Sequence, residues 1–316
     1  MSHPLAAGRV NALACPWRTP EYAAAFGPPW EPIEVPAWGS FILTRPIPGT
    51  STRDAVGCYP LVGFAPGADI ARGLEQLKGK GLVSIVGVPD PLSSPPLDDL
   101  AHHFALCRPY KTHYCIDRRR PPRQLPANHK RKLRRSIGSL HITVGELGEQ
   151  LDCWCDLYNS LIARHRIRGI SAFSRRFFEK IADHPAFTTF VAWHLGEIVS
   201  MALWARSGNA AYYFLGASSR LGYRLSAAYI IMAAAIDHFR DVQWIHLGGG
   251  AGRDTSRDGL SFFKRGFANT DLVALLCGDI LDPHTYAKLS SAEPSTAWFP
   301  AYRASELAGG GKEVMM

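Results

Sequence analysis

Three β-prone segments follow one another closely in the second half of this 316-residue chain, and they constrain its fold more than any other feature. They lie at residues 188–193, 198–205 and 210–215. The two connections, 195–197 and 207–209, are short and contain glycine, which is typical of turns between antiparallel strands. These residues therefore predict an antiparallel meander.

The segment after the meander has apolar residues at helical spacing, so we expect a helix that begins near Arg224 and packs against the sheet. A short buried strand is expected at 244–247, followed by a glycine-rich loop at 248–252. A short helix at 260–265 and a last strand at 272–277 complete the pattern. The apolar face of the first helix consists of Leu225, Tyr229, Met232, Ile236 and Phe239.

Two helices are expected before the meander. Apolar residues recur at helical spacing from Leu151 to Ile162, and Ser174 is a suitable N-cap for the second helix. The order helix, helix, three strands, helix, strand, helix, strand resembles that of a GNAT acyltransferase domain. With a second copy in the less regular first half, the resemblance implies an α/β (α+β) fold of two tandem GNAT-like acyltransferase halves. Their sheets are expected to be mixed, mostly antiparallel and flanked by helices.

No repeat is visible between the two halves at the level of single residues, so their division rests on the resemblance. We expect an N-terminal half at residues 1–145, on the acceptor side, and a C-terminal half at 146–316, which carries the glycine-rich loop. Gly and Pro bracket residues 53–60, which therefore predict a loop. In the first half, strands are expected at 41–43, 82–88, 110–116 and 140–144, and helices at 68–77 and 97–104.

The most basic stretch of the chain lies at 118–137 and contributes to a formal net charge of +8. Such a surplus favours an anionic partner, such as nucleic acid or a nucleotide-linked substrate. Asn128 is a suitable N-cap for a short helix, and Leu133 and Ile137 are four residues apart, so one face can dock while the basic faces remain in water. Those faces either contact phosphate or are simply solvated. The candidate phosphate contacts are Lys130, Arg131, Arg134 and Arg135.

Three segments resemble the Fem-type (FemABX) family of aminoacyl-tRNA-dependent peptidyl transferases, which have a GNAT-like fold. The most specific is the glycine-rich stretch 246–250 followed by 259–267, because the family has such a loop before a Gly-Leu-x-x-Phe-Lys-x-x-Phe pattern. The others are 109–117 with the basic helix, and 211–217 with the helix after it. Together they cover about residues 107–275.

This resemblance implies an aminoacyltransferase that moves an amino acid from aminoacyl-tRNA to an amine of a peptide or peptide-like acceptor, with formation of an amide bond. Members of the family often act on a peptidoglycan precursor, and some relatives serve peptide antibiotic biosynthesis. No cofactor is expected, since aminoacyl-tRNA is itself the activated co-substrate. The amino acid and the acceptor are left open by the sequence.

The resemblance also assigns site residues. The family's Phe-Lys pair, at the meeting point of donor and acceptor, maps onto Phe263 and Lys264, which we expect to be catalytic. A lysine beside the ester can stabilise the oxyanion or hold a nearby phosphate. Phe263 could equally be a core residue, and the glycine loop an ordinary turn. The candidate substrate-binding residues are Arg53, Tyr59, Tyr212, Tyr213, Gly248, Gly249 and Gly250.

Two other functions are compatible with parts of the sequence. A GNAT enzyme that uses acyl-CoA or an acyl-carrier protein usually holds pyrophosphate with a Gln/Arg-x-x-Gly-x-Gly/Ala loop. In the matching stretch 219–224 only Gly222 fits, and the bulky Arg224 replaces a small residue, which disfavours this donor. A non-enzymatic RNA-binding protein is disfavoured because no RRM, KH or zinc-knuckle motif occurs.

The cysteines and histidines predict neither disulfides nor a metal site. The seven cysteines lack the spacing of a disulfide framework, and the twelve histidines lack metal-ligand spacing. We expect His102, His103 and His129 at the surface. No apolar run approaches the roughly 20 residues needed to span a bilayer, and no signal peptide is evident at the start, so a cytoplasmic protein is expected.

Overall fold

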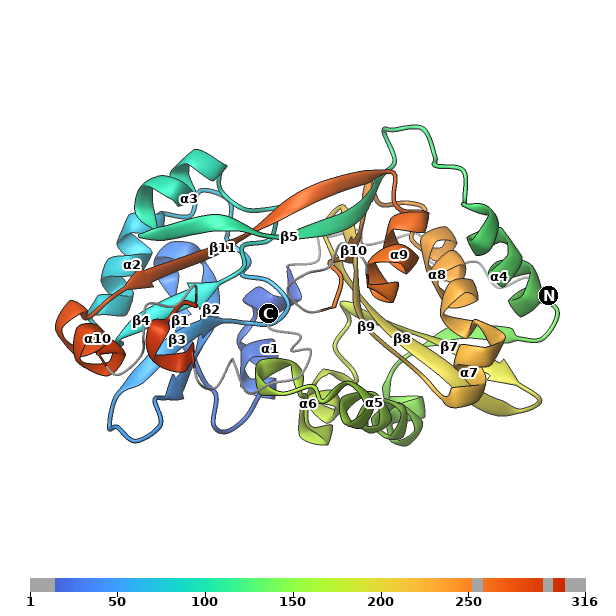
Figure 1. Cartoon of the computed structure of the whole chain (residues 1–316), viewed down its shortest axis with the longest axis horizontal. Coiled ribbons are helices and arrows are strands. Elements are labelled where there is room, and N and C mark those ends of the chain that lie inside the picture. The colour runs from blue at the N-terminus through green and yellow to red at the C-terminus, as the bar shows by residue number, and fades with distance from the viewer. Residues whose placement is uncertain (1–14, 252–257, 292–297, 305–316) are drawn as a thin grey trace.

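A single sheet forms the centre of the molecule (Figure 1). The computed structural model describes residues 15–251, 258–291 and 298–304. Within these residues, eleven strands form one mixed sheet in the order β1-β2-β3-β4-β11-β5-β10-β9-β8-β7-β6. The strands are β1 (Glu31–Val35), β2 (Ser40–Pro46), β3 (Arg53–Gly57), β4 (Ser84–Gly87), β5 (Leu106–Asp117), β6 (His141–Gly145), β7 (Phe187–His194), β8 (Glu197–Ser207), β9 (Ala210–Ser218), β10 (Trp244–Gly248) and β11 (Thr270–Ile280).

Helices pack on both faces of this sheet. In the C-terminal part, α5 packs on β8 and β9 from one side, whereas α8 packs on β7, β8 and β9 from the other (Figure 1). The helices are α1 (Pro20–Ala25), α2 (Ile70–Lys78), α3 (Leu97–His103), α4 (Ala127–Ile137), α5 (Leu151–His165), α6 (Arg175–Ile181), α7 (Arg220–Leu225), α8 (Ala227–His238), α9 (Gly259–Phe267) and α10 (Pro283–Ser290).

The two halves of the chain repeat one topology. In the first half, β1, β2 and β3 are antiparallel, and α2 leads to β4, which pairs parallel with β3. In the second half, β7, β8 and β9 are antiparallel, and α7 and α8 lead to β10, which pairs parallel with β9. A helix and a further strand follow in each case: α3 and β5, or α9 and β11. The predicted fold of two similar α/β halves is therefore confirmed.

The halves exchange their last strands. β5 pairs antiparallel with β10 of the second half, β11 pairs antiparallel with β4 of the first half, and β5 and β11 pair with each other. Figure 1 shows these two long strands crossing the middle of the molecule. Each half of the sheet thus contains a strand from the other half of the sequence. The predicted division between residues 145 and 146 remains a prediction.

Two hydrophobic cores lie on opposite faces of the C-terminal half of the sheet. Tyr212 of β9 lies in the first, together with residues of α5 and α6. Tyr213 packs against the second, which contains residues of α8 and α9. Neighbouring residues of a strand point to opposite faces of the sheet, so the two tyrosines belong to different cores. The first core also includes residues of β2, β3 and β4, so it joins the two halves.

The parallel strands β9 and β10 pair only over residues 210–212 and 244–246. Beyond them, β9 continues to Ser218 alongside β8, with a bulge in that pairing, and the register of β10 on β5 shifts between His246 and Gly248. The two strands therefore separate at their carboxyl ends. Ligands of open α/β sheets bind at the carboxyl ends of strands, so we expect the site at this separation.

Two predicted elements are wrong. Residues 53–57 form β3, hydrogen-bonded to β2 and β4, where the sequence predicted a loop; only the residues after Gly57 leave the sheet. The single helix predicted from Arg224 is two helices, because Ser226 has a φ of 59°. A residue in the left-handed region interrupts a right-handed helix, and the local sequence has no glycine there to predict it.

The basic helix α4 docks differently from the prediction. Its N-cap is Pro126, not Asn128, and Ile137 is 66% exposed instead of docked. The buried residues are His129, predicted at the surface, and Ser136, whose hydroxyl donates to the carbonyl oxygen of Leu225 at 2.9 Å. Leu133 packs against the second core as predicted, but polar side chains also hold α4 in place, which hydrophobic periodicity cannot predict.

Replacing Gly266 with alanine tests the contact between α4 and α9. A Cβ atom there would lie 2.0 Å from Nε2 of His129, whose ring is fully buried. We expect the free energy of unfolding in urea to fall by about 1–3 kcal/mol, the range typical of overpacking. The matched control is Gly259→Ala on the same helix, where a Cβ meets nothing within 4 Å. Equal stability of the two variants would contradict the predicted clash.

Candidate active site

Lys264 lies at the carboxyl end of β10, although its backbone belongs to α9. The side chain of Asp258 caps this helix by accepting from the backbone N–H groups of Leu260 at 2.7 Å and Ser261 at 2.8 Å. Lys264 is only 6% exposed, and its Nζ donates to the carbonyl oxygen of Gly249 at 2.7 Å. Its Nζ also lies 5.4 Å from the centroid of the Tyr213 ring. A buried amine is therefore held where β9 and β10 separate.

Burial sets the charge of this amine. Burial lowers the pKa of Lys264 from its usual 10.5 to about 7, the positive charge of Lys111 lowers it further, and the carboxylate of Asp258 acts in the opposite direction. Burial also lowers the pKa of Lys111, to about 8. Near neutral pH Lys264 therefore exists both as an ammonium, which can donate to an oxyanion, and as a free amine. Such perturbed groups are concentrated at functional sites.

The glycine-rich loop permits close approach from two sides. Gly248 has a φ of +75°, which favours glycine, and a Cβ there would lie 3.3 Å from Nζ of Lys264. A Cβ on Gly249 would lie 3.1 Å from Cδ2 of His113. The dipeptide is thus enclosed between α9 and β5. Gly250 follows as a buried residue.

Two buried histidines lie on the β5 side of this dipeptide. Nδ1 of His113 on β5 and Nε2 of His246 on β10 are 3.0 Å apart and share a hydrogen bond. Burial, together with the charge of Lys264, lowers the pKa of His246 to about 3. Burial also lowers the pKa of His113 well below its usual 6.5, and His246, Lys264 and Lys111 add to this effect. Both rings are therefore neutral near pH 7.

A buried tyrosine and a buried carboxyl continue this polar group. The ring of Tyr212 lies 5.2 Å from that of His246, and its hydroxyl donates to Oδ2 of Asp90 at 2.7 Å. Burial raises the pKa of Asp90, whereas hydrogen bonds from the Leu92 backbone N–H, Tyr212 and Ser93 oppose the rise. Asp90 belongs to the N-terminal half, so polar contacts of the site connect both halves.

The other two candidate tyrosines have different surroundings: Tyr213 lies beside Lys264, whereas Tyr59 packs against the first core. A Cβ on Gly216 would lie 2.0 Å from the Tyr213 hydroxyl, so this glycine leaves room for the phenol. Burial raises the pKa of Tyr213, and the phenols of Tyr223 and Tyr59 add to the rise. Burial raises the pKa of Tyr59 to about 12, and its ring packs on Phe173 and Phe214.

Phe263 and Arg53 lie elsewhere. The ring of Phe263 packs on Tyr229 of α8, with centroids 4.8 Å apart, inside the second core. Arg53 lies on β3, which β4 and β11 separate from β5 in the sheet, and it bonds to Thr44 and Glu31. The structure therefore brings Lys264, Gly248, Gly249 and Tyr213 together. Tyr212, on the opposite face of the sheet, is linked to them through His246. Phe263 has a packing contact instead, and Arg53 has contacts within its own half.

No sequence pattern predicted a role for His113, His246 or Asp90. One signal was present: His246 is a polar residue within a short apolar strand, and His113 lies inside a predicted strand. Its meaning depends on partners that are 133 residues apart, which the local sequence does not reveal. In the described ranges, no group of three or more His, Cys, Asp and Glu side chains could hold a metal ion.

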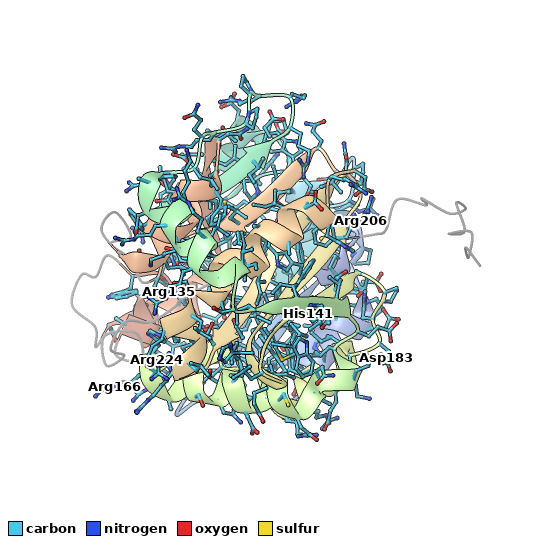
Figure 2. The ribbon with its side chains drawn as sticks, turned by 90° about the vertical axis from the view of Figure 1, so that its right-hand side faces the viewer. Arg135, His141, Arg166, Asp183, Arg206 and Arg224 are labelled. Atoms are coloured by element: carbon cyan, nitrogen blue, oxygen red, sulfur yellow. The ribbon has the colours of Figure 1, made fainter. Side chains whose placement is uncertain are left out.

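The predicted basic residues form an exposed surface beside the site. Lys130, Arg131, Arg134 and Arg135 of α4 are all exposed. α4 contacts the helix that carries Lys264, because Nε2 of the buried His129 lies 3.0 Å from the carbonyl oxygen of Phe263. Figure 2 shows Arg135 on the same side of the molecule as Arg166 and Arg224. None of the helices in the described ranges has the length and apolar content to cross a membrane.

Comparisons with known proteins agree with this architecture. A model of the acetyltransferase (GNAT) domain matches residues 126–264, from the start of α4 to Lys264. Among solved structures, FemX is similar with a TM-score of 0.61 and 13% identity over 86% of this chain and 93% of that chain. The chain has a Fem-like GNAT fold. The resemblance predicted from the glycine loop and the Phe-Lys pair is thus confirmed at the level of the fold.

Two further solved structures share this Fem-like GNAT fold. The C-terminal domain of a putative lysylphosphatidylglycerol synthetase from Agrobacterium fabrum has a TM-score of 0.59 and 16% identity over 85% of this chain and 88% of that chain. L-PGS from Bacillus licheniformis has a TM-score of 0.55 and 12% identity over 83% of this chain and 92% of that chain. No curated protein matches the chain by sequence at a significant level.

Residues 219–224, which correspond to the pyrophosphate loop of CoA-dependent GNAT enzymes, have a packing role in this protein. Ser219 caps α7 by accepting from the backbone N–H of Gly222 at 3.1 Å. A Cβ on Gly222 would lie 2.1 Å from the carbonyl oxygen of Val199 on β8. The close packing of α7 on β8 therefore accounts for this glycine without a bound pyrophosphate.

Proposed function

We propose that the protein is an aminoacyltransferase that moves an amino acid from aminoacyl-tRNA to an amine of a peptide or peptide-like acceptor. The observation that carries the proposal is the buried Lys264, held against Gly249 where β9 and β10 separate. The acyltransferase fold supports the reaction type, since an enzyme that acts on an activated ester mainly has to position the amine and stabilise the oxyanion. The exposed basic face of α4 supports an RNA donor.

In this mechanism the ester carbonyl of the donor lies beside the Lys264 ammonium. One proton of Nζ is used by the carbonyl oxygen of Gly249, so two remain for the substrate. The amine attacks the carbonyl carbon, the C–N bond forms, and the negative charge on the carbonyl oxygen is stabilised by the ammonium. The ester C–O bond then breaks, and the proton lost by the attacking nitrogen passes to the leaving ribose oxygen, so that the tRNA leaves with a free hydroxyl. Because Lys264 is buried, its charge acts in a medium of low polarity, where it is most effective.

An acyl-CoA donor is the second candidate, because the GNAT domain model matches residues 126–264. The structure offers one argument against it: the glycine of the expected pyrophosphate loop is used for packing on Val199. The acceptor remains open as well. One structural neighbour carries the name of a lysylphosphatidylglycerol synthetase, so phosphatidylglycerol vesicles belong among the acceptors tested beside peptides and cell-wall precursors.

The decisive experiment supplies the purified protein with a pool of radiolabelled aminoacyl-tRNAs and these acceptors, with and without RNase, beside a parallel acyl-CoA assay. RNase-sensitive transfer to an amine supports the proposal and identifies the amino acid. Transfer from acyl-CoA alone would make the protein an ordinary N-acyltransferase. Transfer from tRNA to the lipid alone would support the proposed donor and would show that the acceptor is a lipid and not a peptide.

The basic face of α4 gives a second test of the donor. Replacing Lys130, Arg131, Arg134 and Arg135 together with glutamine is expected to raise KM for aminoacyl-tRNA and leave kcat nearly unchanged. The logarithm of affinity falls with the logarithm of salt concentration, with a slope of about 0.7 for each phosphate contact on single-stranded nucleic acid. We therefore expect a shallower salt dependence of KM in this variant.

The matched control removes the same number of positive charges from other helices and turns. It replaces four exposed residues with glutamine: Arg72, Lys80, Lys180 and Lys288. If both quadruple variants weaken tRNA binding equally, net charge alone is responsible and α4 has no special part. If neither changes the salt dependence, the RNA does not bind at α4.

A further inference from the structure

The mechanism above uses neither of the two buried histidines, although they lie against the same dipeptide as Lys264. A Cβ on Gly249 would lie 3.1 Å from Cδ2 and 3.4 Å from Nε2 of His113. The carbonyl oxygen of the same residue accepts from Lys264 at 2.7 Å. Lys264 and the Nε2 edge of His113 therefore approach the same residue, Lys264 at the carbonyl oxygen of Gly249 and His113 at its α-carbon.

The hydrogen bond between the rings fixes how they can carry protons. One proton lies between Nδ1 of His113 and Nε2 of His246, which are 3.0 Å apart. When His113 donates it, Nε2 of His113 has a free lone pair and can accept a proton. The protonated His113 would then donate more strongly to His246, because a hydrogen bond from a charged donor is stronger than one between neutral groups.

We propose that His113 is the proton acceptor for the attacking amine and that His246 is a positioning residue that holds its tautomer. This inference rests on the proposed function. As the amine nitrogen bonds to the ester carbon, one N–H proton passes to Nε2 of His113. When the ester C–O bond breaks, His113 returns this proton to the leaving oxygen. The amide, the free hydroxyl and a neutral imidazole result, so no other reactant is needed.

The charges around the pair explain why His113 accepts a proton only during the reaction. The charged groups that act on the two rings are Lys264 of α9 and Lys111 of β5, and the ring of Tyr212 packs on His246. Behind them, Asp258 and Cys115 act on Lys264, and Asp90 accepts from the Tyr212 hydroxyl. Before the reaction, burial and the two ammonium groups keep the imidazole neutral. An oxyanion beside Lys264 offsets one positive charge, which raises the affinity of His113 for a proton when it is needed.

Tyr212 and Asp90 act through His246 in this arrangement. The Tyr212 ring packs against that of His246, and its hydroxyl is fixed by Asp90. Since Asp90 comes from the N-terminal half, the orientation of the histidine pair depends on how the two halves meet. Contacts of this kind, made by residues behind the catalytic side chain, hold a catalytic ring in its productive geometry.

Two substitutions separate the roles of the histidines. His113→Asn keeps a polar atom near the position of Nδ1, and with it the bond to His246, but removes Nε2. His246→Gln keeps a polar atom near the position of its Nε2, and with it the bond to His113. We expect His113→Asn to lower kcat for an amine acceptor on the order of 10²-fold, a usual contribution of general-base catalysis, and His246→Gln to have a smaller effect. The control is His102→Asn, at an exposed position of α3.

A second nucleophile excludes a merely structural effect. Hydroxylamine attacks aminoacyl esters without the help of a base, so its rate with His113→Asn should remain close to that of the wild type. A distorted site would slow both nucleophiles equally, and that result would overturn the inference. So would an unchanged kcat for the amine in His113→Asn. If His113→Asn does not fold, His246→Gln decides by the same comparison.

The wild type separates this inference from the function on which it rests. If it transfers an amino acid from tRNA and the histidine variants behave like it, only the inference fails. If it transfers none, the proposed function fails and the inference fails with it.

Discussion

The Lys264→Ala variant is expected to lose a factor on the order of 10²–10³ in kcat for aminoacyl transfer, the usual effect of removing one oxyanion-stabilising group. Lys264 is buried to 94%, since only 6% of it is exposed, and its Nζ lies at the carbonyl oxygen of Gly249. Water has little access to this position, so it cannot easily take over the stabilisation of the oxyanion by the Lys264 ammonium. KM for the tRNA should change little, because α4 carries the expected phosphate contacts.

Two control variants make this result specific. Arg265→Ala removes the neighbouring charge of α9, which is exposed, and should keep the kcat of the wild type. Lys264→Arg keeps a charge but replaces a compact ammonium with a larger planar group, so it should restore only part of the rate. Equal activity of Lys264→Ala and Arg265→Ala in single-turnover assays would contradict the role of Lys264.

The sequence predicted the C-terminal meander because its signals are local. Short runs of β-prone residues separated by short glycine-containing turns indicate strands whatever lies elsewhere in the chain. The N-cap at Ser174 and the helix of the Phe-Lys pair were found for the same reason. The exchange of β5 and β11 could not be predicted, because the pairing of distant strands leaves no local pattern.

The site was predicted in part. Lys264 and the glycine loop belong to one contiguous pattern, so the sequence identified them together. His113 and His246 acquire their meaning only from the bulge of β10 on β5, which brings residues of two halves into one hydrogen bond. Arg53 was assigned to the site by the family resemblance and was expected in a loop, but the residue is in β3 and bonds to Thr44 and Glu31.

The second large expected effect concerns stability. Lys264→Met should be more stable than the wild type at pH 7, and the difference should shrink as the pH rises to 10. In the folded protein the pKa of Lys264 is about 7, against its usual 10.5 in the unfolded chain. Between these values the unfolded chain binds more protons, so the stability of the wild type increases with pH. Below pH 7 both states are protonated and this dependence ends.

The size of the effect follows from the two pKa values. Relative to a side chain that never ionises, Lys264 lowers the free energy of unfolding by on the order of 4 kcal/mol at pH 7 and by about 1 kcal/mol at pH 10. Methionine has a similar length and no charge, but it leaves the carbonyl oxygen of Gly249 without its donor. This loss lowers the free energy of unfolding of the variant by about 1–3 kcal/mol at every pH and so offsets part of the gain in stability. The change of the difference with pH is therefore the quantity to measure, by urea unfolding of both proteins at pH 7, 8.5 and 10.

A difference between the two proteins that does not vary with pH would show that Lys264 is not buried as a depressed amine, and the role assigned to its charge would lose its physical basis. The expected result has the opposite meaning. A lysine that makes the fold less stable near neutral pH, and that the reaction cannot do without, is kept for function, because a stable core alone would favour an apolar residue at this position. Higher stability of Lys264→Met together with lost transfer would thus place the active centre at Lys264 by two independent measurements.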